Sequence, residues 1–265
     1  FTTVHVKAAD GIFRGTGAIV NLGESSIADE MVSGTATMNL SFEKGSSTQD
    51  YPSSLMGAVA LIRQTFLDAA WYKSAYEKFK LDPNQPEPNY NISLETLNDQ
   101  LTRKLPALFE VNSTQDIFRA SAIAKEFGYT FIIKGTGCEY ERVDALKQAG
   151  VSLIVPVNFP LPYDVEDPDD ARQVSLQDMK KWELAPTNLS ILAKNNVPFA
   201  VSLDGLKDTK NFWTNLQKAE SFGLTADQVG EKAVDAGVTA EYRGQGLAPG
   251  ASMRRFLVGQ HLACG

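Results

Sequence analysis

The sequence predicts an α/β protein, a partial or distorted eight-stranded β/α barrel. Short strands that are apolar throughout alternate with amphipathic helices in the later part of the chain, as parallel strands covered on both faces do. Two of these helices end in glycine, at Phe127-Gly128 and Ala149-Gly150. The length of 265 residues, 43% of them hydrophobic, suits one large barrel. A doubly wound open sheet is the alternative, but its glycine-rich phosphate-binding signature is missing.

The chain up to about Asn89 is expected to be irregular. Strand-like pieces joined by Gly- and Ser-rich turns are expected at Thr2–Val6, Ala18–Leu22 and Ala36–Phe42. A long helix should run from Leu55 to about Lys80, because apolar residues recur there at three- and four-residue spacing. The proline-rich segment 82–89 ends this helix, since repeated proline removes backbone donors.

Regular alternation of strands and helices follows. The expected strands are Ala107–Val111, Thr130–Ile133, Ser152–Val157 and Phe199–Leu203. The expected helices are Thr114–Phe127, Tyr140–Ala149, Leu176–Leu184, Leu189–Lys194, Lys210–Phe222 and Thr225–Ala236, the last with Thr225 as its N-cap. We therefore assign residues 1–240 to an incomplete barrel and residues 241–265 to a divergent tail.

Composition favours a small-molecule partner. A net charge of −7 and a pI near 5.0 give no long-range attraction for nucleic acid or for anionic membrane surfaces. No apolar run is long enough to span a bilayer, and two cysteines, Cys138 and Cys264, are too few for a disulfide framework. The compartment stays open, with a periplasmic or secreted location preferred to a cytoplasmic one. Because Phe1 opens what reads as a strand already under way, we expect a fragment or a chain processed upstream.

Polar and ionisable groups follow the expected strands, where parallel β/α proteins build their sites. Glu110 and Asn112 lie in the run Phe109–Ile117, and Lys134 and Cys138 lie in the run Ile132–Tyr140. Later strands add Asn158 and Asp204. The candidate site residues are therefore Glu110, Asn112, Lys134, Cys138, Asn158 and Asp204.

The chain resembles the amidohydrolase superfamily, and within it the bacterial imidazolonepropionase-like proteins. The resemblance extends from Phe1 to about Leu224, and no single motif in it is diagnostic. The matching segments, in order, are Gly11–Gly17, Tyr51–Gly57 leading into Leu61–Gln64, Ala124–Gly128, Cys138–Tyr140, Ala149–Val151, Ser202–Gly205 and Phe222–Leu224. The resemblance implies a distorted barrel with one or two divalent metals, zinc above all, at the carboxyl ends of its strands. It also implies hydrolysis of amide or cyclic amide C–N bonds by metal-activated water, with Asp204 as the last-strand aspartate that takes the proton.

The metal-binding histidines of that family are missing from this chain. No His-x-His pair occurs, Glu110 stands at the fifth-strand histidine, and Cys138 or a neighbour stands at the sixth. Asp204, Glu110 and Cys138 are therefore the candidate metal ligands, unless this chain binds no metal. As alternatives, Glu110 forms an ion pair with Lys134 inside the barrel mouth, Cys138 is a small buried residue, and Asp204 caps a turn. Lys134, Asn112 and Asn158 are the candidate substrate contacts.

The two histidines and the C-terminal tail give further expectations. His5 is expected to be a half-buried, hydrogen-bonded histidine, and His261 in the tail has no identifiable partner. In the tail, Gly246–Gly250 fits the element before the family's small β-sandwich, but the sequence then diverges, so at most a remnant of that sandwich is expected. Two functions stay open: a C–N hydrolase, impaired in this chain, or an inactive barrel that serves as a binding or structural module of a larger protein.

Overall fold

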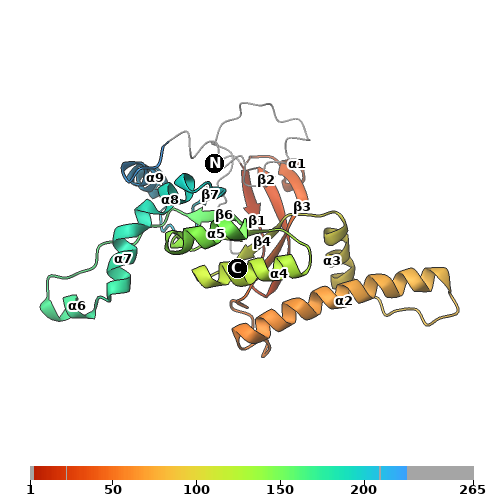
Figure 1. The fold of residues 1–265 in the computed structure, drawn as a ribbon. Coiled ribbons are helices and arrows are strands. Elements are labelled where there is room, and N and C mark those ends of the chain that lie inside the picture. The colour runs from red at the N-terminus through yellow and green to blue at the C-terminus, as the bar shows by residue number, and fades with distance from the viewer. Residues whose placement is uncertain (1–2, 22, 209, 226–265) are drawn as a thin grey trace.

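The computed structural model of the chain describes residues 3–21, 23–208 and 210–225. Its centre is one seven-stranded sheet whose strand order follows the sequence, from β1 to β7 (Figure 1). The strands are β1 Thr3–Val6, β2 Phe13–Asn21, β3 Met31–Ser41, β4 Ala107–Glu110, β5 Phe131–Lys134, β6 Ser152–Pro156 and β7 Phe199–Ser202. The first three strands pair antiparallel, and β3 to β7 pair parallel. Within the described residues β1 does not pair with β7, so the sheet forms a curled half-barrel.

Helices join the strands of the sheet. They are α1 Ile27–Glu30, α2 Leu55–Leu81, α3 Ile92–Thr102, α4 Thr114–Glu126, η1 Glu139–Arg142, α5 Val143–Ala149, α6 Pro168–Gln173, α7 Leu176–Leu184, η2 Ala185–Thr187, α8 Asn188–Lys194 and α9 Asn211–Ser221. Those with buried residues cover one face of the sheet, whereas α1, α6 and α7 bury none. Several start at a side-chain N-cap; Ser54, Asn91 and Ser113 each accept a hydrogen bond from the first turn. Helices α2 and α6–α7 reach beyond the sheet on opposite sides (Figure 1). No described helix is both long and apolar enough to cross a lipid bilayer.

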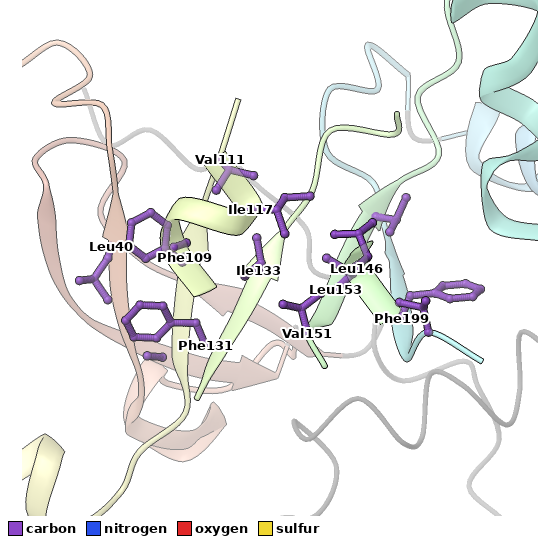
Figure 2. Packing of buried hydrophobic residues seen from close by; sticks show 14 of the residues in the cluster. Leu40, Phe109, Val111, Ile117, Phe131, Ile133, Leu146, Val151, Leu153 and Phe199 are labelled. Atoms are coloured by element: carbon purple, nitrogen blue, oxygen red, sulfur yellow. The ribbon is translucent and has the colours of Figure 1, made fainter. Parts of the chain in front are cut away.

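The main core lies between the sheet and its helices. Alternate strand residues face this layer, because successive side chains of a strand point to opposite faces. Phe109, Phe131, Ile133, Leu153 and Phe199 are all buried in this one cluster. Figure 2 shows them on neighbouring strands, with Ile117 of α4 and Leu146 of α5 among the residues packed beside them.

The opposite, concave face of the sheet carries a smaller apolar cluster. Leu108, Ile132 and Ile154 form it, and Ala200 packs against them. These residues alternate with the main-core residues on the same strands, so the concave face is the interior of the half-barrel. By the same alternation, Glu110 and Lys134 belong to the concave face, at the carboxyl ends of their strands.

The four strands predicted to be parallel are present with ends shifted by at most two residues, as are all but one of the helices predicted within the described residues. Three differences from the prediction concern other elements. The strand-like pieces predicted in the first part of the chain overlap β1, β2 and β3, which form an antiparallel ribbon rather than an irregular region. The elements α1, α3, α6 and η2 were not predicted. The helix predicted at Tyr140–Ala149 begins as the 3-10 turn η1 before α5. The predicted helix Thr225–Ala236, apart from Thr225 itself, and the tail 241–265 with its remnant of a β-sandwich lie outside the described residues.

Candidate functional site

Charged residues gather at the carboxyl ends of the parallel strands. Glu110 is the last residue of β4, Lys134 is the last residue of β5, and the parallel register sets them opposite each other. Asp204 follows the end of β7 by two residues. The Nζ atom of Lys134 lies 3.2 Å from Oε1 of Glu110 and 2.8 Å from Oδ2 of Asp204. The ion pair predicted between Glu110 and Lys134 is therefore present, and Lys134 also binds Asp204.

Two further cations, which the sequence did not reveal as site residues, complete this group. The Nζ atom of Lys7, just after β1, lies 2.5 Å from Oε1 of Glu110. Arg14 of β2 donates to the other carboxylate oxygen of Glu110, and also to the carbonyl of Gly11. We call Lys7, Arg14, Glu110, Lys134 and Asp204 the charge cluster.

The charge cluster is largely withdrawn from solvent and carries a net charge of +1, from three cations and two carboxylates. The side chains of Lys7 and Arg14 are only 6% and 7% exposed, against 27% for Asp204. Burial alone would raise the pKa of Glu110, but Lys134, Lys7 and Arg14 outweigh it and lower that pKa to about 2. Burial also lowers the pKa of Lys7 below its ordinary value, although the neighbouring Glu110 carboxylate acts to raise it. Glu110 is therefore an anion across the physiological pH range.

The donor set of this site does not fit a divalent metal. Zinc in proteins is held by imidazole, thiolate and carboxylate groups in a small shell, whereas here Lys7, Arg14 and Lys134 surround Glu110. In the described part of the chain, no three His, Cys, Asp or Glu side chains are placed to share a metal ion. The predicted ligand trio of Asp204, Glu110 and Cys138 is thus not assembled there.

Cys138 lies directly before η1 and is partly buried. Burial raises the pKa of its thiol above the ordinary value, which favours the neutral form over the thiolate that binds metal. Its backbone amide donates to Oγ1 of Thr136, 3.4 Å away. The alternative prediction was a small buried residue, and in the structure Cys138 is partly buried.

The two predicted asparagine contacts follow the carboxyl ends of β4 and β6. Asn112 is exposed and shares with Glu110 the lining of a cavity of about 170 Å³, beside Phe42 and Leu55. Asn158 follows β6 and is also exposed. Its side-chain amide lies against Gly205, where a Cβ atom would come within 2.6 Å of Nδ2, so Gly205 leaves the space that Asn158 needs.

A second buried carboxylate, to which the sequence analysis gave no role, fixes the loop after β5. Glu139 is fully buried, and its Oε1 accepts hydrogen bonds from the backbone amides of Thr136 at 2.5 Å and Gly137 at 3.0 Å. Its Oε2 accepts from Nδ2 of Asn188 on α8, at 2.6 Å. The Oδ1 atom of Asn188 in turn accepts from the amide of Tyr140. Glu139 therefore ties the rim of the mouth to α8.

His5 is hydrogen-bonded and partly buried, as predicted. Its Nε2 lies 2.7 Å from Oγ1 of Thr37, and Thr37 in turn donates to Asn39. Gly17 belongs to β2, which lies between β1 with His5 and β3 with Thr37. A Cβ atom at Gly17 would come within 2.1 Å of the His5 ring. Burial, and then the charge of Lys7, lower the pKa of His5 to about 4. His5 is therefore neutral at physiological pH.

The His5 pKa makes stability fall on acidification. The unfolded chain binds a proton at His5 near pH 6.5, but the folded chain does so only near pH 4, so acid favours unfolding between these values. We expect this residue to remove about 3 kcal/mol from the free energy of unfolding between pH 6.5 and pH 4. Denaturation with urea at several pH values should show this loss, and His5→Gln should lack it. An NMR titration of His5 with a midpoint near 6.5 would contradict the expectation.

Comparison with solved structures identifies a similar fold. No known protein family and no curated protein matches the sequence. A solved amidohydrolase from Thermotoga maritima MSB8 has a similar fold, with a TM-score of 0.66 and 21% sequence identity, over 86% of this chain. The chain spans 57% of the length of that structure. At this identity the likeness establishes the fold, and it agrees with the half-barrel described above.

Proposed function

We propose that this chain belongs to the amidohydrolase superfamily and derives from a metal-dependent hydrolase of non-peptide C–N bonds, of the imidazolonepropionase-like type. The similar fold of the Thermotoga maritima amidohydrolase supports the superfamily. The position of Asp204, beyond the carboxyl end of β7 and at the mouth, supports the descent of its site. The finer subtype rests on the sequence motifs alone.

In this chain we propose that the mouth binds a small molecule and that hydrolysis by metal-activated water is impaired. One observation carries this proposal: Lys134 Nζ lies between the carboxylates of Glu110 and Asp204. In a hydrolase, Asp204 would take the proton of the attacking water. Here Lys134 already binds Oδ2 of Asp204, so the carboxylate that would face the attacking water is engaged in an ion pair. Asn112 and Asn158, both exposed at the rim, are available to bind a polar ligand.

We expect the purified chain to hydrolyse neither a chromogenic anilide nor a cyclic amide above the background rate, with or without added zinc. Asp204→Ala should leave the measured rate unchanged within about twofold, because the carboxylate is held by Lys134 and activates no water in the impaired site. Continuous absorbance assays measure both variants. A rate above background that disappears in Asp204→Ala would show a working hydrolase and contradict the proposed impairment.

The alternative is an inactive barrel that serves as a structural or binding module within a longer polypeptide. It is favoured by the ion pairs of Lys7, Arg14 and Lys134 with Glu110, which occupy a carboxylate that a metal site would need. Ligand binding separates a binding site at the mouth from a purely structural role. A small polar amide that binds the mouth, detected by calorimetry and weakened by Asn158→Ala, supports the binding site, whereas a purely structural module binds none.

A further inference from the structure

We propose that the ammonium group of Lys134 takes the structural place of a divalent cation in this half-barrel, so that the mouth is held together without metal. This inference rests on the proposed function only in taking a metal site as the ancestral state. The observation behind it is that a cation of the chain itself, Lys134, contacts two carboxylates from separate strands.

The geometry of Lys134 is that of a bridging ion. Its Nζ lies 3.2 Å from Oε1 of Glu110 and 2.8 Å from Oδ2 of Asp204, so one charged atom contacts both carboxylates. Glu110 and Asp204 belong to β4 and to the loop after β7, on opposite sides of β5 and β6. Strand β6 ends in Pro156, which has no charge. The long side chain of Lys134 therefore spans the mouth over β6.

The neighbouring charges explain why a metal does not fit beside this lysine. Lys7 and Arg14 bind Glu110 from the β1 and β2 side, with side chains that are 6% and 7% exposed. A divalent ion that entered between Glu110 and Asp204 would meet these cations as well as Lys134, where little water screens the repulsion. Binding such an ion would require the loss of several existing ion pairs. The two carboxylates of the charge cluster are thus already paired with cations of the chain and need no metal ion for charge balance.

Stability measurements test this bridge without any activity assay. We expect the wild-type chain to contain less than about 0.1 equivalent of zinc by elemental analysis, and its melting temperature to change by less than about 1 °C with EDTA or added zinc. Lys134→Met should lower the melting temperature by about 5 °C, because two carboxylates then lose their shared cation. Lys147→Met, at an exposed lysine of α5, is the matched control and should shift it by less than about 1 °C.

A double-mutant cycle with Asp204→Asn assigns the effect to the bridge. Lys134→Met should lower the melting temperature by much less in the Asp204→Asn background than in the wild type, because one of the bridged charges is already gone. Equal effects in both backgrounds would overturn the inference, and so would stoichiometric zinc whose removal by EDTA destabilises the wild type. The metal measurement decides even if Lys134→Met does not fold. Hydrolytic activity in the wild type would overturn the proposed impairment and leave this inference standing.

Discussion

Replacing Glu110 with glutamine is expected to lower the free energy of unfolding by about 4 kcal/mol at pH 7, because it removes one partner of a largely buried ion network. The carboxylate accepts from Lys7, Arg14 and Lys134, whose side chains are between 6% and 12% exposed. Glutamine keeps the shape of the side chain but cannot neutralise these cations. Three positive groups would then face one another with only Asp204 near Lys134. Urea denaturation of both proteins gives the difference.

The pair of Arg63 and Glu126 supplies the matched control. Glu126 lies on α4 and binds Arg63 at 2.8 Å, but the two side chains are 46% and 43% exposed. Because exposed ion pairs contribute little, Glu126→Gln should cost less than about 1 kcal/mol. Similar losses for Glu110→Gln and Glu126→Gln would show that burial of the charge cluster does not matter to stability.

The pH dependence of Glu110→Gln is a second readout of the same change. The pKa of Glu110 is about 2 in the folded chain, against 4.5 for an ordinary glutamate. Its stabilising effect is therefore fully present above pH 4.5 and is lost as the pH falls toward 2. The difference between the wild type and Glu110→Gln should shrink over this window. A constant difference from pH 7 to pH 2.5 would contradict the lowered pKa.

The parallel half of the fold was predictable because its signals are local. Buried parallel strands are apolar throughout, and their helices end in recognisable glycines, so β4 to β7 and α4 agree with prediction within two residues. Helix α3 was not predicted because its sequence carries only a weak pattern of buried apolar residues. It buries only Leu97 and Gln100, and Ile92 in its first turn is exposed. Its N-cap, Asn91, follows the proline-rich segment, which reads as a loop.

In the antiparallel ribbon, strands were predicted at β1, β2 and β3, but their pairing and the full lengths of β2 and β3 were not, for a different reason. The pairing of β2 with β3 shifts register between Phe13 and Thr16 and again near Ile19. Such irregularities interrupt the alternation of inward and outward residues on which strand prediction depends. Glycines such as Gly15 and Gly17 within β2 weaken the signal further, although Gly17 is where the His5 ring approaches the backbone.

The candidate site was predictable to the extent that parallel strand ends meet. Glu110 and Lys134 end neighbouring strands, so their pairing followed from the expected topology. Lys7 and Arg14 reach the same carboxylate from the antiparallel ribbon, more than ninety residues earlier in the chain, as the 96-residue separation of Arg14 and Glu110 shows. No local pattern records such a contact. The family resemblance predicted metal ligands at these strand ends, whereas the structure places a cluster of paired charges there.

Glu139 is the second residue whose change should be costly, and here hydrogen-bond direction decides the outcome. Glu139→Gln keeps an oxygen for the amides of Thr136 and Gly137 but places an NH₂ group against Nδ2 of Asn188. Asn188 cannot turn its amide around without loss, because its Oδ1 accepts from Tyr140. Two donors then face each other in a fully buried place. We expect a loss of about 3 kcal/mol in the free energy of unfolding, measured in urea.

Asn188→Asp tests whether a second substitution can restore the hydrogen bond that Glu139→Gln removes. Alone, it sets a second carboxylate against Glu139, where the Asn188 Nδ2 atom lies 2.6 Å from Oε2, so it should destabilise by about 4 kcal/mol. Combined with Glu139→Gln, it restores a donor facing an acceptor while the other Asp oxygen still accepts from Tyr140. The double variant should therefore be more stable than either single variant. Glu141→Gln, at an exposed residue of the same 3-10 turn, should change stability by less than about 0.5 kcal/mol. Additive losses in the double variant would mean that the contact of Glu139 with Asn188 does not hold the loop after β5 to α8.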